Sequence, residues 1–268
     1  MENFSPPIRS LGSVFPAIRY IAFFLGLFPF FCSASYVRVA IPSEGLAFSA
    51  AQVGAVGYAA RQRVLTEVAR AELTGCLSYC EVLASVWAAL TPVFQAQHDD
   101  LDLRLVVLRS PDITALSFAD GTVVISEVLI ADQGLDEAQI AFVLAHEASH
   151  ILLQHERQTL TSMMALMPST YERHPEDVYA EIEYRYFADS ESLSIIFQQA
   201  ELEADEIGLQ LAAMARFAPH LQLKFMEQRT TKTADADIFA THPPATDRLL
   251  RLRDQMPLAI RLFQLGKE

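Results

Sequence analysis

The sequence predicts an α+β domain that is mainly helical and carries a small antiparallel sheet. Long segments have apolar residues three and four positions apart, two short alternating segments flank Asp120 and Gly121, and 51% of the 268 residues are hydrophobic against 20% charged. Such a chain buries a sizeable core. We expect a leader at residues 1–36, followed by one domain at 37–268. Within that domain we expect a helical N-terminal part at 48–96 and a core at 101–252.

The leader has the pattern of an export signal or a membrane anchor. Tyr20 to Val37 contains no charge, follows Arg9 and Arg19, and includes small residues around Ala34 that suit cleavage. An uncleaved anchor, a buried N-terminal helix and a lipid on Cys32 are the alternatives. The full chain is acidic, and its formal charge of -13 would repel a phosphate backbone, so we expect no nucleic-acid partner.

Two amphipathic helices are predicted between Ser49 and about Gln95, with a break near Gly75. Cys76 and Cys80 are four residues apart on a predicted helix. A regular helix holds such a pair poorly for bridging, so we expect both to pack on an apolar face rather than form a disulfide or a metal site.

The centre of the chain combines strands and helices. Leu101 to Leu108 is predicted as a strand, and Ala115 to Ala119 forms a hairpin with Thr122 to Ser126. Asp136 can cap a helix that runs to about His155, with Gln139 three positions on. The polar and acidic stretch from Pro168 to Asp189 is expected to be a long surface loop. We hypothesise that its part from Glu172 to Glu191, which lies between the two ligand helices in the sequence, shields the site. Further helices are expected over Ser192 to Met214 and Pro244 to Phe263.

The helix that follows Asp136 contains the pattern HExxH, in which His146 and His150 lie one turn apart and Glu147 follows the first histidine. Positions i and i+4 share one helix face, so both imidazoles reach one metal ion. Glu147 lies on the adjoining flank, where it would take a proton from a zinc-bound water and pass it to a leaving amine. Two hydrogen-bonded core histidines are the structural alternative, but burying them beside a carboxylate without a compensating partner is costly.

A catalytic zinc needs a third protein ligand and one open position. Glu201 and Asp205 lie one turn apart on the helix that ends at Met214, and Ala204 leaves room for close packing. Glu201 would bind the metal, and Asp205 would accept the second ring proton of an imidazole. Glu203 lies on another face and is expected to be solvated. The histidines with no partner pattern are expected at the surface or in packing: His98, His155, His174 and His220.

Three motifs follow one another in the sequence: HExxH, then Glu201 and Asp205, then a His-Pro pair at His242. In this order of motifs the chain resembles the zinc-metallopeptidase family of the CAAX prenyl endopeptidase and the bacterial HtpX protease. The resemblance covers roughly Leu101 to Leu252. It implies a zincin-like domain of the gluzincin type with one Zn²⁺ per chain. It also implies that His242 stabilises the oxyanion during attack, and it matches Arg248 to the family's downstream arginine.

The family is thought to hold an extended substrate by strand addition at a sheet edge. By position that edge would be formed by Val123 to Ser126 and its hairpin partner, with Val123, Val124 and Ile125 as the substrate-binding residues. Thr114 stands where the family often has Asn beside this strand.

The predicted function is a zinc-dependent endopeptidase that cleaves internal bonds of misfolded or membrane-associated proteins. One alternative is a catalytically silent, zinc-binding module with a binding or chaperone-like role; another is a hydrolase of a non-peptide amide or ester. The general base Glu147 argues against the silent module. We expect the chain in the bacterial periplasm or at the periplasmic face of the inner membrane, with protein or peptide substrates and a membrane contact if the leader stays uncleaved.

Overall fold

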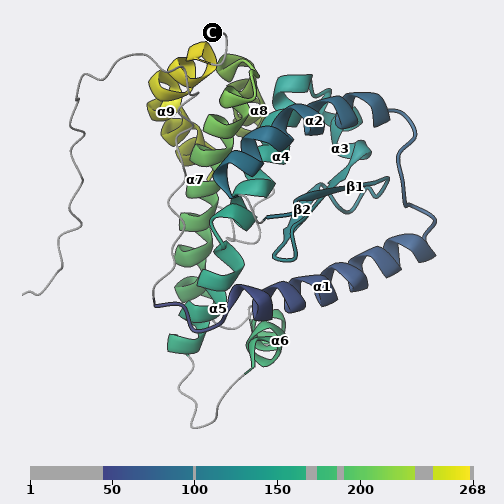
Figure 1. The fold of residues 1–268 in the computed structure, drawn as a ribbon, viewed down its shortest axis with the longest axis vertical. Coiled ribbons are helices and arrows are strands. Elements are labelled where there is room, and N and C mark those ends of the chain that lie inside the picture. The colour runs from purple at the N-terminus through teal and green to yellow at the C-terminus, as the bar shows by residue number, and fades with distance from the viewer. Residues whose placement is uncertain (1–44, 99–100, 167–173, 186–189, 233–243, 266–268) are drawn as a thin grey trace, which may run out of the picture. The chain divides into compact units, whose positions relative to one another are not determined.

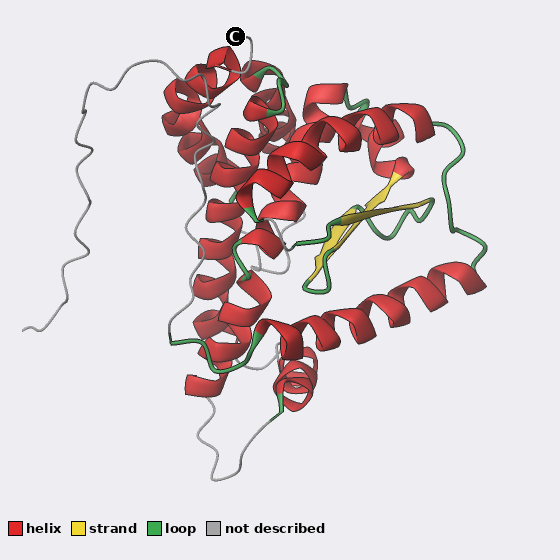
Figure 2. Ribbon diagram, in the orientation of Figure 1, coloured by secondary structure: helices red, strands yellow, loops and turns green. Residues whose placement is uncertain are grey.

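The computed structural model describes residues 45–98, 101–166, 174–185, 190–232 and 244–265 (Figure 1). The leader and His242 lie outside these residues. The described part is mainly helical with one small sheet (Figure 2). Its elements in chain order are α1 (Ala50–Arg70), α2 (Cys80–Gln97), β1 (Arg104–Leu108), β2 (Ala115–Phe118), β3 (Thr122–Ser126), α3 (Glu127–Gln133), α4 (Glu137–Leu152), α5 (His155–Leu166), α6 (Pro175–Arg185), α7 (Ser190–Met214), α8 (Pro219–Lys232) and α9 (Ala245–Leu265).

The sheet is mixed rather than antiparallel, in the order β1-β3-β2. The predicted hairpin of β2 and β3 is confirmed: it turns at Gly121, whose φ is 93°, and pairs Phe118 with Thr122. Strand β1, however, runs parallel to β3 and pairs Arg104 with Thr122. The hairpin pattern fixes only the pair joined by a tight turn, so it could not predict the strand that adds to the other side of β3.

Helices cover both faces of the sheet. Val123 and Ile125 belong to the main core, which includes residues of α2, α4, α7 and α9. Val124, between them on β3, faces a smaller cluster with Val68 of α1 and Leu108 of β1. This alternation follows from the two-residue period of a strand, and it places the sheet between α1 and the helices of the main core (Figure 1).

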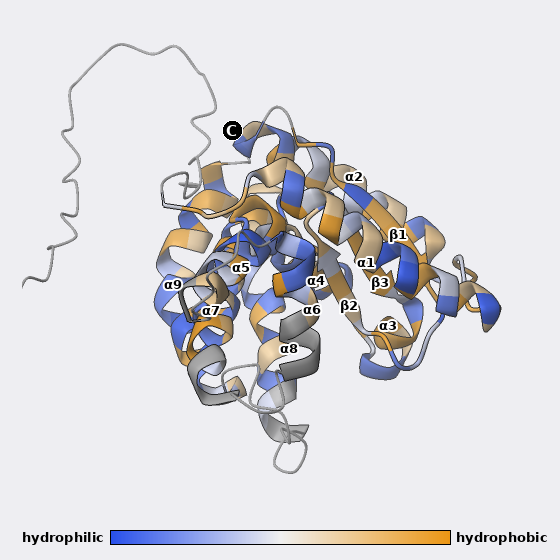
Figure 3. Cartoon of the chain, turned by 90° about the horizontal axis from the view of Figure 1, so that it is seen from below, coloured by the Kyte–Doolittle hydropathy of each residue, from blue (hydrophilic) through white to orange (hydrophobic). Residues whose placement is uncertain are grey.

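Helix α4 is the central element of the core. Its predicted N-terminus is confirmed, because Asp136 accepts the N–H of Gln139 while the Gln139 side chain accepts the N–H of Asp136. Nearly all of its residues are buried, since it packs against α2, α7 and α8. Helix α9 alternates between hydrophilic and hydrophobic segments in Figure 3, as expected for a helix with one face in the core. Among the described helices, none combines the length and apolar character required to cross a bilayer.

Two local predictions were wrong. Cys76 and Cys80 form a disulfide, with 5.6 Å between their Cα atoms. Only Cys80 is in α2, and Cys76 follows Gly75, whose φ is 81°, so the two do not share a regular helix. The expected surface loop also contains a helix, α6, because Val178 is buried against a small cluster with Leu160 of α5. The rest of that stretch, 168–173 and 186–189, lies outside the described residues.

Candidate metal centre and cleft

Three side chains that can bind a metal converge from α4 and α7. The Nε2 atoms of His146 and His150 lie 3.1 Å apart, and the two carboxylate oxygens of Glu201 lie 3.5 Å from the first and 3.4 Å from the second. Tetrahedral zinc with bonds of about 2.0 to 2.1 Å requires donors about 3.3 Å apart. Two imidazoles and one carboxylate therefore fit zinc in both spacing and chemistry, and they form a candidate metal group in the described residues.

The close approach of the two ligand helices depends on Gly208 of α7. A Cβ added there would lie 2.8 Å from the backbone nitrogen of His146 and 2.9 Å from its Cα. Ala204, one turn earlier, is fully buried. These two small residues allow α7 to lie directly on the HExxH turn of α4, so that Glu201 reaches the imidazoles.

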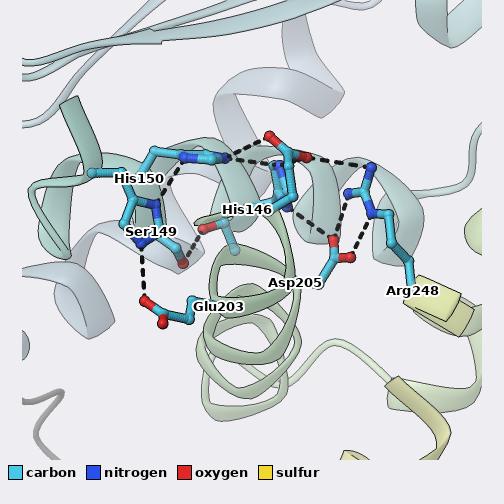
Figure 4. Close-up of polar contacts among 9 residues, drawn as sticks. His146, Ser149, His150, Glu203, Asp205 and Arg248 are labelled. Atoms are coloured by element: carbon cyan, nitrogen blue, oxygen red, sulfur yellow. Dashed lines mark hydrogen bonds and ion pairs between the residues drawn. The ribbon is translucent and has the colours of Figure 1, made fainter. Parts of the chain in front are cut away.

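Behind His146 lies a buried ion pair (Figure 4). Asp205 is 3.0 Å from His146 Nδ1 and accepts two hydrogen bonds from the Arg248 guanidinium, at 2.6 and 2.7 Å. Burial opposes ionisation of Asp205, but the Arg248 charge outweighs it and lowers the pKa of the Asp205 carboxyl. Burial likewise opposes protonation of His146, while the Asp205 and Glu201 carboxylates raise the pKa of His146 above its usual value. The structure thus places Asp205 and Arg248 together with the metal ligands.

Behind His150 lies a contact that the sequence reasoning missed. The Nδ1 atoms of His155 and His150 are 2.9 Å apart, and His155 Nε2 is 3.3 Å from a carboxylate oxygen of Glu203. Glu203 was expected to be solvated; its side chain is 40% exposed and also accepts a hydrogen bond from Gln199. His155 is buried in the site. Its spacing of five residues from His150 does not repeat along a helix face, so helical periodicity gave no signal.

Glu147 and the two histidines line a cleft of about 750 Å³. The cleft is also lined by Thr114 and the residues of β2, together with parts of α1, α5 and α6. The predicted general base, its neighbouring ligands and a strand therefore face one space, which is the arrangement needed to hold a chain beside the metal.

The strand beside the cleft is β2, not β3. Val123, Val124 and Ile125 are fully buried and pair on both sides, with β1 and with β2, so the expectation that they form the sheet edge is wrong. The predicted hairpin partner takes that position: among the described residues, no strand pairs with the outer side of β2. The edge of the sheet beside the cleft is therefore β2 rather than β3.

Alternate residues of β2 offer their backbone groups to the cleft. The carbonyl of Thr114 accepts the N–H of Ser126, so Thr114 faces β3, and the residues two and four positions later face it as well. The N–H and C=O groups of Ala115 and Ser117 consequently point away from the sheet. The next outward N–H, at Ala119, is already bound to the Glu156 carboxylate at 3.1 Å. The free edge is therefore two alternate residues long.

Glu156 is an unusual carboxyl at the end of this edge. One of its oxygens binds Ala119, and the other is buried without a hydrogen-bond donor. Burial is the main cause that raises the pKa of Glu156 to about 7; the Ala119 N–H opposes this, and the Asp120 carboxylate adds to it. Asp120 is itself paired with Arg61, at 2.8 Å. No motif or spacing in the sequence singles out Glu156.

Comparison with known proteins agrees with this geometry. The family model of peptidase family M48 matches residues 81–256. The chain is also 26% identical over 163 residues to the β-barrel assembly-enhancing protease of Escherichia coli K12 and to its Shigella flexneri counterpart, covering 56% of this chain and 33% of each relative. The Yersinia pestis protein of that name is 26% identical over 148 residues. The chain spans about a third of the length of these relatives. With the matched region covering most of its length and including the whole metal group, the chain belongs to peptidase family M48.

Proposed function

We propose that the chain is a zinc-dependent metalloendopeptidase that hydrolyses internal peptide bonds of misfolded or membrane-associated envelope proteins, with one zinc ion per chain. The observation that carries the proposal is the single cleft in which a three-donor metal group, Glu147 and the free edge of β2 face one another. His146, His150 and Glu201 would hold the zinc. When bound, zinc supplies a Lewis acid that polarises the scissile carbonyl and makes water a better nucleophile near neutral pH.

Glu147 provides the proton transfer. It follows a metal ligand in α4 and lines the cleft, so its carboxylate can accept a proton from the attacking water. The hydroxide adds to the carbonyl carbon, and the same proton passes from Glu147 to the leaving amine as the C–N bond breaks. For His242 we keep the role that the family implies, a hydrogen bond to the carbonyl oxygen during attack.

Substrate alignment follows from the strand edge. An extended segment adds to β2 by hydrogen bonding to the backbone of Ala115 and Ser117. Such binding reads backbone groups more than side chains, so the proposed substrates are defined by local unfolding rather than by a fixed sequence.

An oxidising compartment is supported by the Cys76–Cys80 disulfide, because disulfides persist in secreted and periplasmic proteins. The relatives whose name links them to β-barrel assembly support a role in envelope protein quality control. We therefore place the protein in the periplasm or at the periplasmic face of the inner membrane, with the leader as the route of export or the anchor.

The test compares the wild type with Glu147→Gln in casein hydrolysis and zinc content. The variant keeps the three ligands and loses the base, so we expect equal zinc and a fall in hydrolysis of about 10²- to 10⁴-fold. Equal zinc without hydrolysis in either protein would support the silent binding module instead. Hydrolysis of esters by the wild type without cleavage of casein or peptides would favour a non-peptide substrate.

A further inference from the structure

We infer that His155, supported by Glu203, is a positioning residue that fixes the ring orientation and the proton position of the metal ligand His150. The inference deepens the proposed function, since it concerns the same zinc site. It predicts that zinc affinity depends on His155, although this histidine contacts His150 and is not itself one of the metal ligands.

The ring nitrogens can be assigned in sequence. His150 directs Nε2 toward His146 and Glu201, at 3.1 and 3.4 Å, so Nε2 is the metal-binding atom and must carry no proton. A neutral imidazole then carries its proton on Nδ1. That Nδ1 lies 2.9 Å from Nδ1 of His155. His150 is therefore the donor in this contact.

The same logic extends to Glu203. Because His155 accepts at Nδ1, its own proton is on Nε2, which lies 3.3 Å from the Glu203 carboxylate. Each proton in the series from His150 through His155 to Glu203 has one acceptor. The arrangement therefore favours the tautomer of His150 that has its proton on Nδ1 and leaves Nε2 free to bind a metal. Hydrogen-bond partners behind metal-binding histidines have this effect in general.

The backbone is shaped to make this contact. In an uninterrupted α4, a residue five positions after His150 would lie about 140° away around the helix axis. The chain instead leaves α4 after Leu152, and Gln154 adopts φ 57°, a left-handed conformation that is unfavourable for a residue with a side chain. Helix α5 then starts at His155 and returns its ring to the His150 ring, with centroids 4.9 Å apart.

Burial makes the contact hard to replace. His155 is 5% exposed, and its ring is enclosed between α4, α5 and α7. Removing its acceptor would leave the Nδ1–H of His150 facing an apolar group. A buried donor without a partner is unfavourable, and His150 would rotate or exchange its tautomer, either of which withdraws Nε2 from the metal.

The experiment uses a matched pair of substitutions at His155 in the full chain. His155→Leu has a similar size and no acceptor. His155→Asn carries an oxygen close to the position of Nδ1 and can still accept from His150. Zinc dissociation constants are measured by chelator competition, and cobalt-substituted proteins are examined by visible absorption, which reports the geometry of the ligands.

We expect zinc to bind about 10 to 100 times more weakly to His155→Leu, with a changed cobalt spectrum, and His155→Asn to recover most of the affinity. Glu203→Leu should weaken binding less, because it acts through His155. The exposed His220 offers a control: His220→Leu should bind zinc as the wild type does. The melting temperature of each metal-free protein separates loss of ligand positioning from loss of fold.

Wild-type zinc affinity and cobalt spectrum in His155→Leu would overturn the inference, as would equal losses in the Leu and Asn variants with unchanged melting temperatures. If His155→Leu does not fold, Glu203→Leu and His155→Asn still test the series. None of these readouts requires hydrolysis, so a wild type that binds zinc and cleaves nothing would refute the proposed function without deciding this inference.

Discussion

Two walls of the cleft can be compared: the α7 wall, which carries Glu201, and the α1 wall, which lies beside β2. In each, a glycine allows a helix to approach a neighbouring backbone closely, but the two glycines are packed beside different hydrophobic clusters. Gly208 places α7 on α4 at His146, within the large core. Gly57 places α1 on the end of β2, where an added Cβ would lie 2.7 Å from the backbone nitrogen of Ala119. The α1 wall rests on two small hydrophobic clusters instead. The metal geometry and the position of the strand edge are thus fixed by separate packing contacts.

Gly208→Ala should have the largest effect. A methyl group there overlaps the backbone of His146, so the helices must separate and Glu201 must move away from the imidazoles. We expect a loss of about 1 to 3 kcal/mol in unfolding free energy and at least about tenfold weaker zinc binding. Urea denaturation and chelator competition measure the two quantities. Unchanged zinc affinity would mean that the ligand set does not depend on this approach.

Glu156→Gln tests a second difference between the walls. The buried Asp205 pairs with Arg248, whereas no cationic side chain among the described residues pairs with Glu156. The pKa of Glu156 is raised from 4.5 to about 7 in the folded protein, so the wild type loses stability as pH rises through this interval. The full loss, about 3 kcal/mol at 1.36 kcal/mol per pKa unit, is present above pH 7. Glutamine does not titrate.

We therefore expect the stability advantage of Glu156→Gln over the wild type to grow between pH 5 and pH 8, in urea titrations at each pH. A difference that stays constant with pH would show that Glu156 is not buried as described. Asp136→Asn is a suitable control, since it changes an acidic helix cap to another good cap and leaves the cleft unchanged.

Gly57→Ala should affect the α1 wall alone. We expect a loss of about 1 to 2 kcal/mol in unfolding free energy, a higher KM for extended peptides and unchanged zinc affinity. Comparing this variant with Gly208→Ala in the same zinc assay tests directly whether the metal site and the strand edge are held by separate packing contacts. Equal losses of zinc affinity in both variants would contradict it.

Ser117→Pro should produce the smallest change in free energy. Proline removes an N–H that points to the open edge, so the bonds between β2 and β3 remain. Losing one substrate hydrogen bond should lower kcat/KM for an extended peptide about tenfold, with zinc content unchanged. Ser117→Ala keeps the N–H and should behave as the wild type. Full activity of the proline variant would place the substrate elsewhere in the cleft.

Sequence reasoning predicted the parts of this molecule that depend on local periodicity. The cap at Asp136, the pair His146 and His150, and the second ligand helix with Glu201 all follow from spacing within one helix. The resemblance supplied Arg248, which lies far along the chain and has no local pattern that points to the metal.

What the sequence reasoning missed depends on chain reversals and on tertiary pairing. His155 reaches His150 only because the helix is interrupted at Gln154. Glutamine is not a residue type that predicts a left-handed conformation or a helix end, so the interruption could not be predicted. The parallel pairing of β1 with β3 is set by packing on α2 and α4, and it moves the free edge from Val124 to Ser117. The disulfide was missed for a similar reason, since α2 begins at Cys80 and leaves Cys76 outside the helix.

The length of the free strand edge has a consequence for how the protein would tell damaged proteins from intact ones. Among the described residues of β2, Ala115 and Ser117 direct their backbone groups away from the sheet, and Glu156 already binds the next outward N–H, that of Ala119. A native protein rarely presents even a few residues of extended, unpaired chain, whereas a stalled or unravelled one presents many. If substrates bind at this edge as proposed, its shortness would favour locally unfolded chains over intact proteins without requiring a fixed recognition sequence.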